Sequence, residues 1–235
     1  MTDHLFPTLA ELDRDGAIAE AASRVDGHTR AAFMGKVAAL VGGTAAVSSL
    51  AMPALASAAS KGDVAILNYA LTLEYLEAAF YKSANDKGAL SGEAKKLAKV
   101  VGEHEAQHVV ALKKALGSAA VKSPSFDFKG TTADQGTFLK TSMTLEDAGV
   151  KAYLGQAGAI KSKDILSAAA SILSVEARHA SWVANVLKVS PAPEAFQSSA
   201  TMDQILAAVK GTGFIPALAS ASPSSATSGS PSVTG

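Results

Sequence analysis

The chain has 235 residues, of which 48% are hydrophobic, and its 21 basic side chains are balanced by 21 acidic ones. This length suits one folded domain with appended segments better than two full domains. Because the chain has no cysteine, disulfide bonds and thiolate metal sites are excluded. No run of lysine or arginine predicts binding to nucleic acid or to an acidic membrane surface.

Residues 1–56 have the layout of an export signal. A polar region precedes a stretch without charge that runs from Val37 to Ser60. Small residues at 54–56 and 56–58 offer cleavage sites, so we expect the mature chain to start near residue 57 or 59. An uncleaved membrane anchor is the alternative, because such a stretch is long enough to span about 30 Å of hydrocarbon.

The segment before the uncharged stretch resembles a twin-arginine signal. Thr29, Arg30, Phe33 and Lys36 match the pattern, but Ala31 stands where the second arginine belongs, which leaves the export pathway open. The resemblance implies export to the periplasm or cell envelope, or release outside the cell. A protein that crosses the membrane folded can carry a metal that was loaded in the cytosol.

From Lys61 onward, apolar residues recur every three or four positions, which is typical of helices. The pattern predicts four helices, over about residues 61–86, 91–117, 132–160 and 163–188. Because amphipathic helices must bury their apolar faces against one another, we expect an all-α four-helix bundle over residues 57–190. The stretch 118–132 then forms a long crossover between two helical hairpins.

The chain after the bundle has a different composition. Residues 191–210 contain two prolines and a short predicted helix from Thr201 to Lys210. Residues 211–235 are rich in Ser, Ala, Gly, Thr and Pro, and this composition predicts a disordered tail.

Each predicted long helix carries a glutamate near its middle, on its inner face. On the second and fourth helices a histidine follows three residues later, and residues three apart lie on one helix face. The predicted metal ligands are Glu74, Glu105, His108, Glu146, Glu176 and His179.

The two hairpins repeat these positions. The sequence 72–74 (Thr-Leu-Glu) recurs 72 residues later at 144–146, Tyr81 recurs as Tyr153 at the same offset, and the Glu-Ala-x-His sequence of 105–108 recurs 71 residues later at 176–179. Ligand identity and spacing are therefore duplicated together. We expect the six side chains to meet at one level of the bundle.

Four carboxylates in a bundle core repel one another and lose hydration unless cations replace the water. Two divalent ions supply four positive charges, and this set of glutamates with Glu-x-x-His pairs is the ligand pattern of di-iron carboxylate bundles. Oxygen and imidazole ligands suit two iron ions or manganese, and zinc stays compatible with them. The partners that follow are metal ions with dioxygen or peroxide.

Several other side chains accompany these ligands. Tyr81 and Tyr153 are predicted catalytic residues that donate to a bridging carboxylate or pass electrons, with simple packing and a solvated hydroxyl as the alternative. The remaining neighbours in the sequence are expected to point away, as surface groups or as contacts to the ligands: Glu77, Glu103, His104 and Asp147.

Over about residues 61–188, the chain resembles the ferritin-like superfamily, in particular the exported bacterial ferritin-like proteins described as desiccation-related. The motifs that carry the resemblance lie at 73–81, 103–108, 145–153 and 176–179. It implies a ferritin-like fold, the same six metal ligands, and redox handling of iron with dioxygen or peroxide in stress protection of the cell envelope. The alternative is a structural or interaction protein in which the metal only stabilises the bundle. The sequence leaves the oligomeric state open, a homo-oligomer included.

Overall fold

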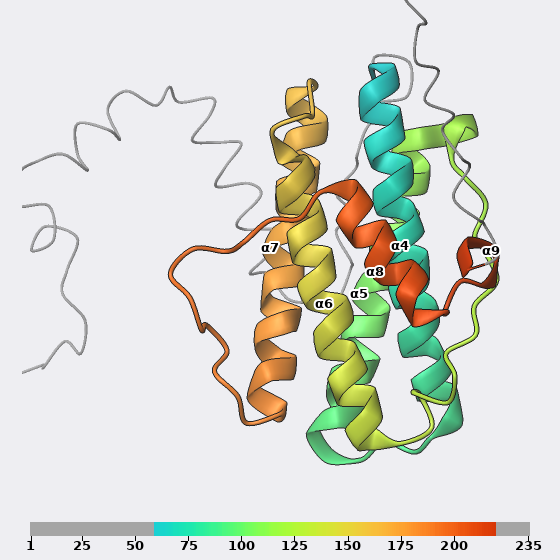
Figure 1. The fold of residues 1–235 in the computed structure, drawn as a ribbon, viewed down its shortest axis with the longest axis vertical. Coiled ribbons are helices and arrows are strands. Elements are labelled where there is room, and N and C mark those ends of the chain that lie inside the picture. The colour runs from blue at the N-terminus through green and yellow to red at the C-terminus, as the bar shows by residue number, and fades with distance from the viewer. Residues whose placement is uncertain (1–58, 220–235) are drawn as a thin grey trace, which may run out of the picture. The chain divides into compact units, whose positions relative to one another are not determined.

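The computed structural model describes residues 59–219, and within this range the chain is helical (Figure 1). The predicted export region and its alternative, a membrane anchor, lie outside the described residues. The helices of the described part are α4 (Lys61–Lys87), α5 (Gly92–Leu116), the short 3₁₀ helix η1 (Gly117–Ala119), α6 (Gln135–Ala157), α7 (Lys163–Val186), α8 (Met202–Thr212) and α9 (Pro216–Ala219).

The four long helices form a bundle of two antiparallel hairpins, as Figure 1 shows. Helix α4 pairs with α5 and α6 pairs with α7, while α4 also packs on α6 and α5 on α7. The connection between the hairpins runs the length of the bundle, so that α5 and α6 start at the same end. The predicted all-α bundle with a long crossover is therefore confirmed.

Side chains at the helix starts explain where the helices begin. Ser60, Asp134 and Ser162 precede α4, α6 and α7, and each accepts a hydrogen bond from a backbone N–H of the first turn. Helix α4 ends at Gly88, whose φ of 66° is a left-handed conformation that glycine adopts readily. Helix α6 is shorter than predicted because the Asp134 cap starts it at Gln135 and Gly158 ends it.

The apolar core consists of two clusters. One contains Phe80, Tyr81 and Phe138, and the other contains Leu71, Leu112 and Tyr153. Each fully buried Leu, Ile or Phe side chain contributes about 1.5–3 kcal/mol to folding, so these clusters supply most of the driving force. The two repeated tyrosines belong to different clusters, and the acidic side chains of the bundle lie between the two.

The segment that leads into α8 crosses α6 in close contact. The backbone N–H of Ala200 donates to the Lys151 carbonyl at 3.2 Å. A Cβ atom at Gly155 would lie 1.9 Å from the Ala200 carbonyl oxygen, so only glycine allows this approach. Helix α8, with a capping box formed by Thr201 and Gln204, then packs on α6.

Residues 211–219, which the composition assigned to a disordered tail, are folded. Helix α8 extends to Thr212, and Phe214 and Ile215 are buried in the core. The Asp127 N–H of the crossover donates to the Phe214 carbonyl at 2.9 Å. The prediction is wrong for these residues because two apolar side chains suffice to anchor a segment whose average composition is that of a linker.

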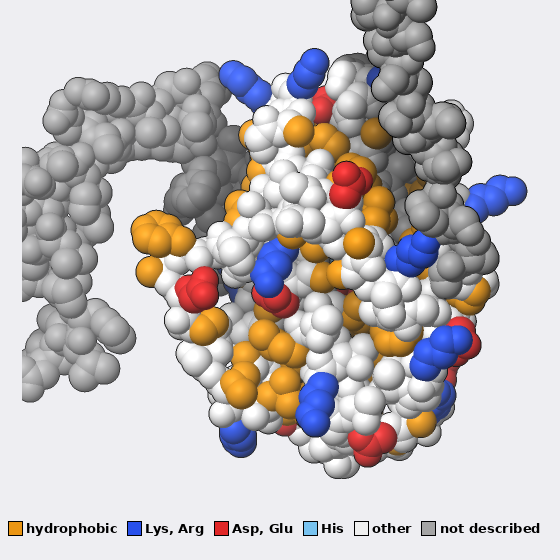
Figure 2. Space-filling model, viewed as in Figure 1, with side chains coloured by type: hydrophobic (Ala, Val, Ile, Leu, Met, Phe, Trp, Pro, Cys, Tyr) orange, Lys and Arg blue, Asp and Glu red, His pale blue; other side chains and the backbone are white. Residues whose placement is uncertain are grey.

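The surface of the described residues carries charges of both signs. On the face seen in Figure 2, lysine and arginine side chains are interspersed with acidic ones, and apolar side chains show between them. Among the helices of the described residues, none has both the length and the apolar character that a membrane span requires.

Candidate metal centre

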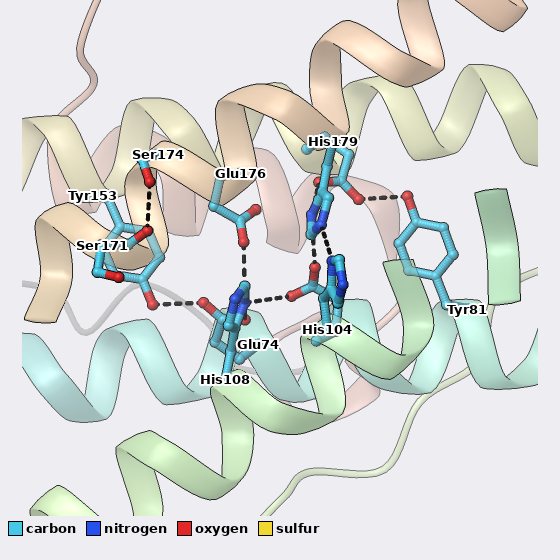
Figure 3. Close-up of polar contacts among 11 residues, drawn as sticks. Glu74, Tyr81, His104, His108, Tyr153, Ser171, Ser174, Glu176 and His179 are labelled. Atoms are coloured by element: carbon cyan, nitrogen blue, oxygen red, sulfur yellow. Dashed lines mark hydrogen bonds and ion pairs between the residues drawn. The ribbon is translucent and has the colours of Figure 1, made fainter. Parts of the chain in front are cut away.

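The six predicted ligands meet in the bundle core. Figure 3 shows the four of them that it labels between the two tyrosines: Glu74, His108, Glu176 and His179. The four glutamates are fully buried, His179 is buried, and the His108 side chain is 12% exposed. Every long helix contributes: Glu74 from α4, Glu105 and His108 from α5, Glu146 from α6, and Glu176 and His179 from α7. The structure thus brings these side chains together, and their role as metal ligands stays a prediction.

The six side chains form two groups that share two carboxylates. Within each group the candidate ligand atoms lie within 4.8 Å of one another, and the groups are Glu74, Glu105, His108 and Glu176, and Glu105, Glu146, Glu176 and His179. The His108 Nδ1 atom lies 3.2 Å from Glu105 Oε2, and the His179 Nδ1 atom lies 3.0 Å from Glu105 Oε1. The two oxygens of Glu105 therefore face different imidazoles, as expected of a carboxylate that bridges two ions.

The unshared glutamates complete the two groups. Glu74 Oε2 lies 3.1 Å from His108 Nδ1, and Glu146 Oε2 lies 3.2 Å from His179 Nδ1. Each group therefore offers one imidazole nitrogen and three carboxylate oxygens, without sulfur. Such ligands suit iron or manganese and remain compatible with zinc.

Several polar atoms of this cluster form no hydrogen bond among the described residues, although three of the carboxylate oxygens lie 3.0–3.2 Å from a histidine Nδ1 atom. Buried polar atoms are almost always paired, so a group of unpaired ones requires an explanation. All of these atoms are ones that a cation would contact, and they are Glu105 Oε1, Glu146 Oε2, both Glu176 carboxylate oxygens and His179 Nδ1. The donor set therefore fits metal ions better than it fits an empty protein core.

The electrostatics of the cluster lead to the same conclusion. Burial, together with the neighbouring carboxylates, raises the pKa of Glu105 and of Glu176 well above the usual range. Burial also opposes the ionisation of Glu74, but the charge and hydrogen bonds of His108 hold the pKa of Glu74 below its usual value. Without cations the cluster retains protons, and metal ions would have to displace them.

Both repeated tyrosines donate hydrogen bonds to the cluster from buried positions. The Tyr153 hydroxyl donates to Glu74 Oε1 at 2.5 Å, and the Tyr81 hydroxyl donates to Glu146 Oε1. Burial raises the pKa of both tyrosines well above the usual range, which keeps them protonated as donors. The hydroxyls are therefore not solvated, and they contact the unshared glutamates rather than the shared ones. Their catalytic role stays a prediction.

Two of the four side chains expected to point away contact the cluster or lie within it. His104 is exposed, yet its Nδ1 atom lies 2.9 Å from His179 Nε2, on the side of the ring opposite the carboxylates. Burial and then the nearby histidines lower the pKa of His104, which favours its neutral form, and a neutral His104 Nδ1 can accept a hydrogen bond from His179 Nε2–H. A hydrogen bond of this kind orients a metal-binding imidazole.

The prediction that Glu77 points away from the cluster is wrong. Glu77 is 3% exposed and lies among the other carboxylates, whereas Glu103 is exposed and Asp147 pairs with Lys151 at 2.5 Å. The prediction failed because residues three apart on a helix are separated by only about 60° around the axis, so Glu77 shares the inner face with Glu74. The same spacing had already identified the Glu-x-x-His pairs and was the available signal.

Comparison with known proteins agrees with this geometry. No curated protein matches the chain. A family model described as a ferritin-like domain matches residues 62–189, which span the four long helices and the whole cluster. Since this match covers more than half of the 235 residues, the chain belongs to the ferritin-like domain family.

Proposed function

We propose that the chain binds two metal ions in the bundle core. One ion is held by Glu74 and His108, the other by Glu146 and His179, and Glu105 and Glu176 are shared between them. The observation that carries this proposal is the pair of overlapping groups, with one imidazole nitrogen each, built from fully buried glutamates. Several buried cluster atoms that lack a hydrogen-bond partner support it.

The function that this site supports best is redox handling of iron with dioxygen or peroxide. Two ferrous ions held there would supply two electrons for the reduction of one peroxide molecule, with two protons, to two molecules of water. The protein residues hold the ions, exclude bulk water and keep protons in place, the last through the buried hydroxyls of Tyr81 and Tyr153.

The cluster lies nearest to solvent on the side of α5, where its histidines are. The His108 side chain is 12% exposed, whereas the carboxylates around it are fully buried. His104, one turn earlier on α5, is exposed and contacts His179. Solvent thus approaches the histidine side of the cluster most closely, which suits dioxygen or peroxide better than a large substrate.

The setting of this activity is proposed from the sequence. Residues 1–56 resemble an export signal, which supports a periplasmic, envelope or extracellular location after cleavage near residue 57 or 59. The resemblance to desiccation-related ferritin-like proteins supports a role in envelope stress protection. Intact mass measurement of the protein purified from fractionated cells tests both the cleavage and the location, and an uncleaved chain in the cytosol would contradict the proposal.

A structural role for the metal is the second candidate. One observation favours it: each of the four long helices contributes a ligand, so bound ions would hold the whole bundle together. In this alternative the metal raises the melting temperature but no turnover accompanies it.

One experiment separates the two candidates. The protein is purified from its native compartment and its metal content is measured, after which metal-free protein is loaded with ferrous iron and mixed with peroxide. Two ions per chain and rapid oxidation of the iron support the redox function. Metal-dependent melting without oxidation supports the structural role, and protein that binds no metal excludes both.

A further inference from the structure

Glu77 belongs to neither of the two groups of ligand atoms, yet it is buried beside them. Its side chain is 3% exposed, and its Oε1 atom has no hydrogen-bond partner among the described residues. A buried carboxylate oxygen without a partner costs about 1–3 kcal/mol or more, so this side chain needs a cation or a donor. No hydrogen bond or ion pair within the described residues provides one.

The position of Glu77 along α4 shows which end of the cluster it faces. It lies between Glu74 and Tyr81, and the Tyr81 hydroxyl reaches Glu146. Figure 3 shows that the cluster extends from Tyr153 and Glu74 at one end to His179 and Tyr81 at the other. Glu77 is therefore displaced from Glu74 toward the end that holds Glu146 and His179.

Gly149 on α6 is a close neighbour of Glu77 from the other hairpin. A Cβ atom at residue 149 would lie 3.4 Å from Glu77 Oε1 and 2.9 Å from Glu176 Oε2. Both carboxylates thus approach the same point of the α6 backbone, one turn beyond Glu146.

The second hairpin has no carboxylate at the position that corresponds to Glu77. At the offset of 72 residues that relates Glu74 to Glu146, Glu77 corresponds to Gly149. At the offset of 71 that relates His108 to His179, His104 corresponds to Val175. The first hairpin therefore carries two polar groups that the second lacks, and both lie near the end with Glu146 and His179.

We propose that Glu77 is a further metal ligand, specific to the ion that Glu146 and His179 hold, so that the two metal positions are unequal. This inference rests on the proposed two-metal site. Glu77 adds a fifth carboxylate to the four shared and unshared glutamates, and His104 orients His179 at the same position. The position of Glu146 and His179 therefore binds divalent cations more tightly than the position of Glu74 and His108.

The test is a calorimetric titration of the metal-free full chain with Mn²⁺. Wild type is expected to bind two ions with different affinities. Glu77→Gln should lower the affinity for the more tightly bound ion by about 10–100-fold, the range known for residues that support a metal site. The affinity for the other ion should change little. Glu103→Gln is the matched control, because Glu103 is exposed on α5 and both affinities should be retained.

A double-variant comparison assigns the position. The losses of binding free energy from two substitutions should not add when both residues bind the same ion. They should add when the residues bind different ions. Glu77→Gln should therefore cause no further loss in a Glu146→Gln background, but should weaken the remaining ion in a Glu74→Gln background. The rise in melting temperature that Mn²⁺ gives should also be smaller in Glu77→Gln, and Glu77→Asp replaces it if the glutamine variant does not fold.

The outcomes are distinguishable. Wild type that binds no Mn²⁺ overturns the two-metal site and this inference together. Wild type that binds two ions, with both affinities unchanged in Glu77→Gln, overturns only the role of Glu77. Equal weakening of both ions also overturns it, because the proposal assigns Glu77 to one position.

Discussion

The Tyr153 hydroxyl, on the second hairpin, donates a hydrogen bond to the Glu74 carboxylate on the first at 2.5 Å. The converse contact also exists, since Tyr81 on the first hairpin donates to Glu146 on the second. Each unshared glutamate of the candidate metal centre is thus held by a tyrosine from the opposite hairpin. Orienting bonds of this kind affect both the stability of the protein and the affinity for metal.

Removing one of these hydroxyls should destabilise the protein. We expect Tyr153→Phe to lower the free energy of unfolding by about 1–3 kcal/mol, because Glu74 Oε1 loses its buried donor. Denaturant unfolding measures this change. Tyr75→Phe is the control: its hydroxyl donates to the Val121 carbonyl at 3.3 Å near the surface, and a change within about 0.5 kcal/mol is expected. Equal effects of the two variants would contradict the proposed role of the contact.

Substitution of a shared glutamate and of an unshared one should have different effects on the number of bound metal ions. Glu146→Ala should weaken one ion disproportionately, because Glu146 belongs to one group only, whereas Glu105→Ala should weaken both ions. Metal analysis after dialysis measures the stoichiometry, and circular dichroism checks that each variant is folded. A Glu146→Ala protein that still binds two ions as wild type does would show that the assignment is wrong.

Enlarging Gly149 should disturb the site without replacing any candidate ligand. In Gly149→Ala the new Cβ atom would lie 2.9 Å from Glu176 Oε2, so that carboxylate must move. We expect weaker binding of both ions in a metal titration, since Glu176 is shared. Gly158→Ala is the matched control on the same helix, because its Cβ atom would meet nothing within 4 Å and its φ is −71°.

Asp63 should contribute stability that is lost in acid. Its carboxylate accepts hydrogen bonds from the backbone N–H groups of Lys161 and Ser162, which hold the loop between α6 and α7 onto the start of α4. The hydrogen bond from Lys161 has the largest effect on the pKa of Asp63. It holds this pKa below its ordinary value of 3.8, while burial acts in the opposite direction. The folded state therefore binds fewer protons than the unfolded state as the pH falls through this range.

The pH dependence of Asp63→Asn tests this sign. At pH 7 the variant should be less stable than wild type by about 1–2 kcal/mol, because one charge-assisted pair of hydrogen bonds is weakened. The difference should shrink as the pH falls below about 4, where the unfolded wild-type chain begins to bind a proton at Asp63, and it should vanish once the folded state is protonated as well. Asp86→Asn, whose exposed carboxylate pairs with Lys82, is the control variant measured over the same pH range. Parallel curves for Asp63→Asn and wild type down to pH 2 would be inconsistent with the lowered pKa.

The helical pattern predicted the bundle well because it depends on local periodicity. The predicted helix 61–86 is observed as Lys61–Lys87, and the inner glutamates of all four helices are buried. Helix ends that depend on a cap side chain, such as Asp134, were less accurate. The tail was misjudged because the burial of Phe214 and Ile215 depends on partners far away in the sequence.

The same distinction applies to the candidate site. Spacing and duplication predicted which six side chains would meet, because each helix presents its own inner face. They did not predict that the tyrosines exchange partners between hairpins, nor that His104 reaches His179, since such contacts depend on the distance between helices. Glu77 is a different case, because its three-residue spacing from Glu74 could be seen in the sequence. Gly149, which has no side chain, leaves room for the Glu77 carboxylate on the facing helix.

The exchanged tyrosines make each half of the duplicated sequence incomplete. A half that was expressed separately would retain its glutamates but would lose the hydroxyl that steadies one of them, and its own tyrosine would be left with nothing to bind. Substitutions in one repeat therefore have their consequences in the other. Sequence changes at these tyrosine and glutamate positions are therefore coupled between the two copies.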